Sequence, residues 1–120
     1  MLELFIGGNY QGHNHLAIKA YNGIIADGKE DSIESIENAD IIINYHEFVR
    51  KIIEMGKDPL EVSQNISAKV VACDEVGCGV VPMDKKQILY REAVGRSCCI
   101  LAERADKVTR VICGIGEIIK

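Results

Sequence analysis

A glycine-rich segment near the start of the chain is the first place where residue types and spacing point to chemistry. Gly7, Gly8 and Gly12 lie between an apolar run and a helix-forming segment. This is the spacing of a loop whose backbone N–H groups and following helix N-terminus cradle phosphate. We therefore predict a nucleotide- or phosphate-binding segment made of Gly7, Gly8, Asn9, Gly12, His13 and Asn14.

The last two residues of that segment lack the groups that nucleotide chemistry uses. Such loops carry Lys, which reaches the β and γ phosphates, and then Ser or Thr, which holds Mg²⁺; this chain has His13 and Asn14. A neutral imidazole and an amide are poor replacements. Because phosphoryl transfer depends on positioned charge, we predict that ordinary ATP-driven catalysis is lost and that the backbone can still bind an anion. The alternative is that the glycines only make a strand-to-helix turn.

The segments that must position this loop alternate between short apolar runs and helical patterns. Asp31 with Glu34 has capping-box spacing, Gly56 offers a helix stop, and Asp58-Pro59 begins another helix. One apolar helical stripe contains residues 48, 49, 52 and 53, and a long helix is expected over 85–104, with a bend at Gly95 as an option. Strands are expected at residues 2–6, 23–26, 40–44, 69–73 and 107–113. Continuous apolarity in these runs predicts an α/β fold in a single domain, 1–120: a three-layer, phosphate-loop-like fold with a mainly parallel sheet of about five strands.

Composition limits the classes of partner. The 120 residues carry a net charge of −4, which argues against a broad basic surface for nucleic acid or anionic membrane. No apolar run approaches a membrane span or a secretory signal, so we expect a cytoplasmic protein. Five cysteines without C-x-x-C spacing are expected to be reduced, with Cys73 and Cys113 acting as small apolar residues. A redox role for the adjacent pair Cys98-Cys99 is the alternative.

The second half of the chain carries a more specific signal. It reads VVACDEVGCGVVP at 70–82, YREAVGR at 90–96, LAERADKV at 101–108 and Gly-Ile-Gly at 114–116. From about Ala68 to Lys120 the chain resembles the bifunctional adenosylcobinamide kinase and adenosylcobinamide-phosphate guanylyltransferase family, whose first strand and phosphate loop are also similar to residues 2–14. The resemblance implies a place in cobalamin biosynthesis, GTP or ATP with Mg²⁺ as cofactor, a nucleotide or corrinoid as small-molecule partner, and assembly into homo-oligomers.

The chain departs from that family at several positions. Asn44 falls where the family has an acidic residue for Mg²⁺, and only residues 27–39 fill an interval in which the family carries a nucleotide-accepting histidine. His46 follows the third strand, so it is not in the matching place, and we interpret it as a core-edge or surface residue. His13 and His15 are too divergent in direction on a helix to form a metal site, so none is expected.

A second candidate site follows the fourth strand. It comprises Glu75, Gly77, Gly79 and Arg91, and the strand's carboxyl end is where open α/β sheets bind ligands. An architectural role is the alternative. Three hypotheses result: a degenerate nucleotide- or corrinoid-binding relative, an active nucleotidyl- or phosphotransferase that uses replacement residues such as His13 or His46, and a structural partner of full-length family members.

Overall fold

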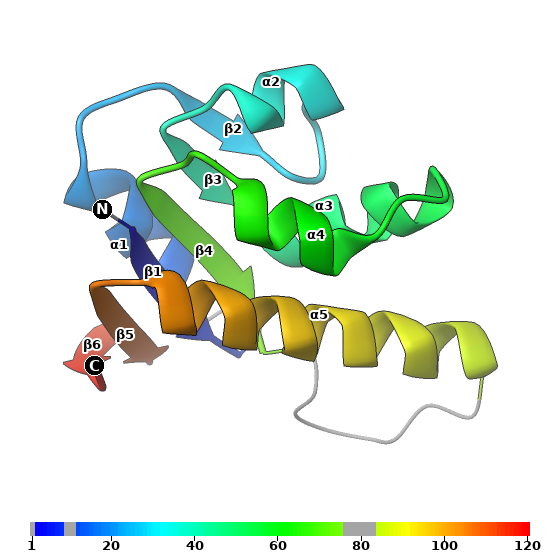
Figure 1. The fold of residues 1–120 in the computed structure, drawn as a ribbon. Coiled ribbons are helices and arrows are strands. Elements are labelled where there is room, and N and C mark those ends of the chain that lie inside the picture. Colours follow the sequence, from blue (N-terminus) through cyan, green and yellow to red (C-terminus); the bar gives the residue numbers. More distant parts are fainter. Residues whose placement is uncertain (1, 9–11, 76–83) are drawn as a thin grey trace.

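A six-stranded sheet forms the centre of the molecule, as seen in the computed structural model, which describes residues 2–8, 12–75 and 84–120 (Figure 1). Its strand order is β2-β3-β4-β1-β5-β6. The strands are β1 (Glu3–Gly7), β2 (Ile25–Asp27), β3 (Ile41–Ile43), β4 (Val70–Asp74), β5 (Lys107–Ile112) and β6 (Ile115–Ile118). The α/β fold class is confirmed. The predicted site residues Asn9, Gly77 and Gly79 lie outside the described residues.

The first five strands are parallel, and β1 lies at the centre. Leu4 is paired with Val71 of β4 on one side and with Val108 of β5 on the other. Parallel strands buried on both faces need continuous apolar sequence, which is the pattern that predicted them. Their carboxyl ends therefore meet at a single edge of the sheet, where β1 ends at Gly7.

The strand β6 was not expected from the sequence. It pairs antiparallel with β5 through a tight turn at Cys113 and Gly114. Both turn residues have positive φ, 51° and 77°, as two-residue hairpin turns of the I′ type require. Because Cys rarely adopts positive φ, the sequence Cys-Gly does not predict a hairpin turn. Cys113 is exposed, so the prediction that it packs as an apolar residue is wrong, whereas Cys73 is buried as expected.

The helices cover the two faces unequally. They are α1 (His13–Ala20), α2 (Ile33–Glu37), α3 (Tyr45–Glu54), α4 (Pro59–Asn65) and α5 (Lys85–Arg104). α1 packs on one face over a small cluster that includes Phe5, Ala17 and Val111. The other four share the larger core on the opposite face, where Leu4, Phe48 and Leu101 are fully buried.

The helix boundaries follow local capping chemistry. Gly56 follows the end of α3 and has a positive φ of 76°, as glycines that terminate helices often do. The Asp58 carboxylate caps α4 by accepting a hydrogen bond from Leu60 N at 3.0 Å. α5 runs unbroken through Gly95. The capping prediction for α2 was wrong by one residue, because Ser32 is the N-cap and Asp31 instead accepts from Asp27 N at 2.7 Å.

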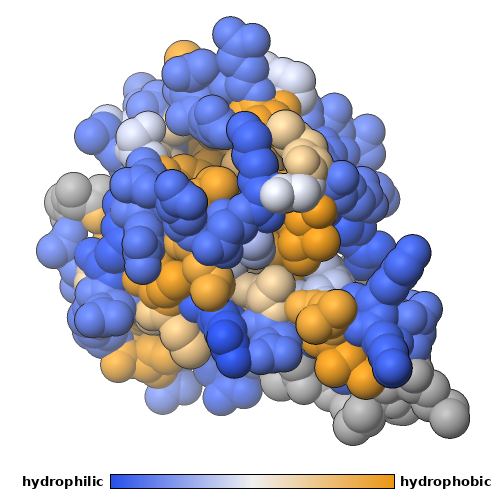
Figure 2. Space-filling view, turned by 45° about the vertical axis from the view of Figure 1, so that its right-hand side comes forward, coloured by the Kyte–Doolittle hydropathy of each residue, from blue (hydrophilic) through white to orange (hydrophobic). Residues whose placement is uncertain are grey.

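The surface is mostly polar, with apolar side chains exposed in separate patches (Figure 2). Of the predicted α3 stripe, Phe48, Val49 and Ile52 are buried, but Ile53 is exposed, so the stripe is narrower than expected. Within the described residues no helix is both long and apolar enough to cross a membrane.

Candidate functional site at the carboxyl edge of the sheet

The carboxyl ends of four parallel strands gather polar side chains at one edge. β1 ends at Gly7, β2 at Asp27 and β4 at Asp74, and Asn44 directly follows β3. α1 begins at this edge with His13 and Asn14, and α3 begins there with Tyr45 and His46. The structure thus brings the described residues of the predicted loop next to polar groups that are distant in sequence.

Gly12 sets the start of α1. It is the N-cap residue, with φ of 90° and ψ of 9°, a left-handed conformation that favours glycine. A Cβ at this position would also lie 3.4 Å from Gly114 Cα of the β5–β6 turn. Among the described residues no side chain caps the helix, and the first turn of α1 contains no acidic residue of its own.

His13, the first residue of α1, is turned into the protein. Its side chain is only 4% exposed, and Nε2 lies 2.6 Å from Asp74 Oδ1. Within the described part of the chain, the buried Nδ1 atom has no hydrogen-bond partner. The sequence did not predict this pair, and the only signal for it was that Asp74 ends an apolar run.

His46 lies on the other side of Asp74. Its Nδ1 accepts a hydrogen bond from Asp74 N at 3.2 Å, so the ring proton belongs on Nε2, which faces Asp74 Oδ2 at 3.5 Å. Burial lowers the pKa of His46, and the carboxylates of Asp74 and Glu47 oppose that shift only in part. The imidazole is therefore neutral at pH 7. The interpretation of His46 as a core-edge residue is confirmed, since it is 8% exposed.

Asn14 belongs to a second chain of hydrogen bonds. Asn44 Nδ2 donates to Asp27 Oδ1 at 2.9 Å, and Asn14 Nδ2 donates to Asn44 Oδ1 at 3.0 Å. Because a carboxylate only accepts, Asp27 fixes the orientation of both amides. Asn14 Oδ1 is left buried and unpaired among the described residues.

The fit of these residues to Mg²⁺ is limited. Mg²⁺ takes oxygen ligands and is usually held by one or two protein groups together with substrate phosphates. Asn14 Oδ1 is one such oxygen, but Asp27 Oδ1 already accepts from Asn44 Nδ2 and from Lys29 N. Among the residues that the structure describes, no group of three His, Cys, Asp or Glu side chains could hold a metal ion. Any Mg²⁺ here would have to arrive with a ligand's phosphates and use Asn14.

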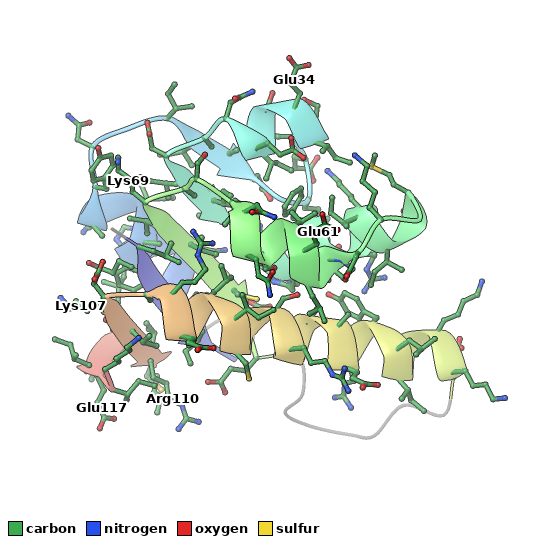
Figure 3. The ribbon with its side chains drawn as sticks, viewed as in Figure 1. Glu34, Glu61, Lys69, Lys107, Arg110 and Glu117 are labelled. Carbon is green, nitrogen blue, oxygen red and sulfur yellow. The ribbon has the colours of Figure 1, made fainter. Side chains whose placement is uncertain are left out.

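The second predicted site is brought to the same edge only in part. Glu75 N donates to Gly7 O at 2.8 Å, which ties the end of β4 to the start of the glycine loop. Glu75 Oε1 lies 3.5 Å from Arg110 Nε on β5, and Arg110 projects beside its register partner Glu117 on β6 (Figure 3). Arg91 lies on the second turn of α5.

An apolar crevice lies beside this edge, between the last turns of α3 and the first turns of α5. It has a volume of about 440 Å³ and is lined by Arg50, Ile53, Glu54, Lys86, Gln87, Leu89 and Tyr90. Tyr90 connects the crevice to the edge, because its hydroxyl donates to His46 O at 3.2 Å. The Arg50 guanidinium lies 4.3 Å from the centre of the Tyr90 ring, a cation–π contact.

A larger hollow of about 750 Å³ lies elsewhere. Residues that line it precede β3 and β4 or belong to α4, among them Glu37, Asn38, Glu61 and Ser67. It contains none of the edge residues described above, and its lining is mainly polar. We therefore place the candidate site at the carboxyl edge and not in the larger of these two hollows.

Comparison with known proteins gives one family. A model of the family described as cobinamide kinase / cobinamide phosphate guanyltransferase matches residues 32–119, nearly three quarters of the chain. The matched region starts at the cap of α2 and therefore includes Asn44, His46 and Asp74 but not the glycine loop. No curated protein matches the chain.

Proposed function

The chain belongs to the cobinamide kinase / cobinamide phosphate guanyltransferase family, and we propose that it binds a phosphate-bearing nucleotide or corrinoid of cobalamin metabolism without acting as a kinase. The observation that carries the proposal is the state of His13. At the position where a lysine would reach for phosphate, this side chain is buried and hydrogen-bonded to Asp74 at 2.6 Å.

The phosphate group would be bound by the backbone at the start of α1. The first N–H groups of a helix have no intrahelical partner and carry a partial positive charge. Gly12 precedes them without a Cβ, and within the described part of the chain no capping side chain and no acidic residue of the first turn competes for them. Nothing in this arrangement depends on the lost lysine, so binding and catalysis can be separated.

The organic part of the ligand would lie in the crevice between α3 and α5. Apolar pockets with a few polar groups are the usual form of small-molecule sites. Here Ile53 and Leu89 supply apolar surface, and Arg50 and Lys86 supply positive charge at the rim. The hydrogen bond from the Tyr90 hydroxyl to His46 O joins α5, which lines the crevice, to the start of α3 at the carboxyl edge.

Phosphoryl transfer is not supported by the same residues. The reaction needs positioned positive charge on the phosphates and usually a metal ion. The His13 ring is committed to Asp74, and the Asp27 carboxylate is committed to Asn44. The protein would therefore hold a nucleotide or corrinoid phosphate without activating it.

Calorimetric titration of the full chain with GTP, ATP and adenosylcobinamide phosphate tests the proposal. We expect binding of at least one of them, weakened tenfold or more by Gly12→Ala. The matched control is Gly56→Ala, which has a similar φ of 76°, no atom within 4 Å of the added Cβ, and a place remote from the edge. Absence of binding to every ligand, or equal effects of the two variants, would refute the proposal.

A second candidate function is nucleotidyl transfer through a histidine. It is favoured by Nδ1 of His13, which has no hydrogen-bond partner among the described residues, because an imidazole oriented by a carboxylate at its other nitrogen is a common form of activated group. Incubation with labelled GTP and Mg²⁺ distinguishes the two functions. Covalent label that is lost in His13→Asn and kept in His15→Asn supports transfer, and no label together with calorimetric binding supports the binding protein.

A further inference from the structure

The strand β4 and the helix α5 bring two cysteine sulfurs into contact. Cys73 Sγ and Cys98 Sγ are 3.3 Å apart, although 25 positions separate the residues. Cys73 is fully buried in the main core, and Cys98 packs against the same core with part of its side chain exposed. The Cys73 thiol also donates a hydrogen bond to Asp74 O, with 3.5 Å between sulfur and oxygen.

We propose that Cys73 and Cys98 form a reversible disulfide that crosslinks β4 to α5 when the protein meets a small-molecule disulfide. A disulfide has an S–S length of about 2.05 Å, so the two sulfurs must approach by only about 1.2 Å. The pair is distinct from the adjacent cysteines predicted from the sequence. Cys99 is exposed on the other side of α5, and the partner of Cys98 comes from β4.

The reaction starts at Cys98. The hydrogen bond with Cys98 and complete burial both raise the pKa of the Cys73 thiol, so the partly exposed Cys98 is the thiol that reacts first with the oxidant. The Cys98 thiolate attacks one sulfur of the small disulfide and releases one thiolate, leaving a mixed disulfide. Cys73 then attacks the Cys98 sulfur while its proton passes to the departing sulfur, so that the second half of the small disulfide leaves as a thiol. One small disulfide is reduced to two thiols, and the two cysteines are oxidised.

The crosslink would act on the part of the core that carries the site. It closes the chain segment between β4 and α5, which restricts the unfolded chain and stabilises the fold. Cys73 immediately precedes Asp74, whose backbone N–H donates to His46 and whose carboxylate contacts His13. Oxidation would therefore hold this strand end against α5.

Hydroxyethyl disulfide, with 2-mercaptoethanol as its reduced form, is a suitable probe. After incubation, free thiols are alkylated in denaturant, and the protein is analysed by intact mass and peptide mapping. We expect a single Cys73–Cys98 crosslinked peptide, the other three of the five cysteines each alkylated or carrying a mixed disulfide, and a melting temperature that rises on oxidation and returns with dithiothreitol.

Three variants make the test decisive. Cys99→Ser is the matched control on the same helix and should form the crosslink like the wild type. Cys98→Ser should lose both the crosslink and the rise in melting temperature, and Cys73→Ser should stop at the mixed disulfide on Cys98. Alkylation of all five cysteines in the oxidised wild type, a crosslink between other cysteines, or a stable mixed disulfide on wild-type Cys98 would overturn the proposal.

Discussion

Replacing Asp74 by Asn probes the contact on which the candidate site depends. The carboxylate accepts from His13 Nε2 at 2.6 Å and faces His46 Nε2 at 3.5 Å. Since His46 Nδ1 is an acceptor, its Nε2 carries the proton, and both histidines point donors at Asp74. An amide has one acceptor oxygen, so it can serve one histidine while its NH₂ group opposes the other.

The expected cost follows from burial. A hydrogen bond to a charged group contributes about 1.5–3 kcal/mol when it is removed from water, against about 0–1 kcal/mol for an exposed ion pair. His13 and Asp74 have side chains 4% and 17% exposed, so Asp74→Asn should lower the free energy of unfolding by about 2 kcal/mol. For 120 residues the unfolding entropy is about 0.25 kcal/mol/K, which converts this loss to a melting temperature lower by about 8 °C.

Urea unfolding and calorimetry at pH 7.5 measure the effect, and Glu92→Gln is the control. Glu92 and Arg96 of α5 are also 2.6 Å apart, but their side chains are 50% and 65% exposed. The two pairs therefore have the same distance and differ in burial. We expect Glu92→Gln to change stability by less than about 0.5 kcal/mol. Equal effects of the two substitutions would show that the Asp74 contact is not desolvated and would refute the reasoning.

Three further predictions concern stability. Because burial lowers the pKa of His46 below 6.5, the unfolded chain takes up the proton first; the free energy of unfolding should fall as pH drops through 6.5, by at most about 1.4 kcal/mol per pH unit, and level off below the folded-state pKa. Urea midpoints of wild type and His46→Asn at pH 5–8 check this, since the variant should lack that component. Gly28→Ala places a Cβ on a backbone carbonyl after β3 and should destabilise by about 2–3 kcal/mol, whereas Gly95→Ala, with nothing within 4 Å, should stabilise by about 0.5–1 kcal/mol in thermal melts. Tyr45→Phe removes the 2.7 Å hydrogen bond to buried Ser63 and should cost about 1 kcal/mol by urea unfolding.

Much of the fold could be predicted because its signals are local. The periodic spacing of apolar residues predicts the long helix over 85–104, and continuous apolar runs predict the central strands. The incorrect predictions concern positions where contacts distant in sequence decide between two locally favourable structures. Asp and Ser are both favourable N-cap residues. Ser32 is the N-cap of α2, because the Asp31 carboxylate accepts a hydrogen bond from Asp27 N instead. The β6 strand depends on a Cys-Gly turn whose first residue is unfavourable in isolation.

The site could be predicted only as a set of separate residues. The loop glycines have a fixed spacing, so Gly12, His13 and Asn14 were identifiable. The partner of His13 lies 61 positions away, and no periodicity connects the two. Glu75 was predicted because the carboxyl end of a strand is where open α/β sheets bind ligands, and Asn44 was identified only by the family resemblance. Neither argument predicted that Asp74 contacts a histidine.

His13 and Asn14 are hydrogen-bonded to residues at the strand ends, and this bears on whether introducing the lysine and hydroxyl of a phosphate loop would create a kinase site. His13→Lys would bring an ammonium group beside the Asp74 carboxylate, where an ion pair would hold it away from any phosphate. Asn14→Ser would shorten the side chain that donates to Asn44 Oδ1 and remove that hydrogen bond from the partly buried acceptor. In the first substitution the new ammonium group pairs with Asp74 and not with a ligand, and in the second Asn44 loses its hydrogen-bond donor. A kinase site would require changes at His13, Asn14, Asn44 and Asp74 together, because the hydrogen bonds at this edge couple them.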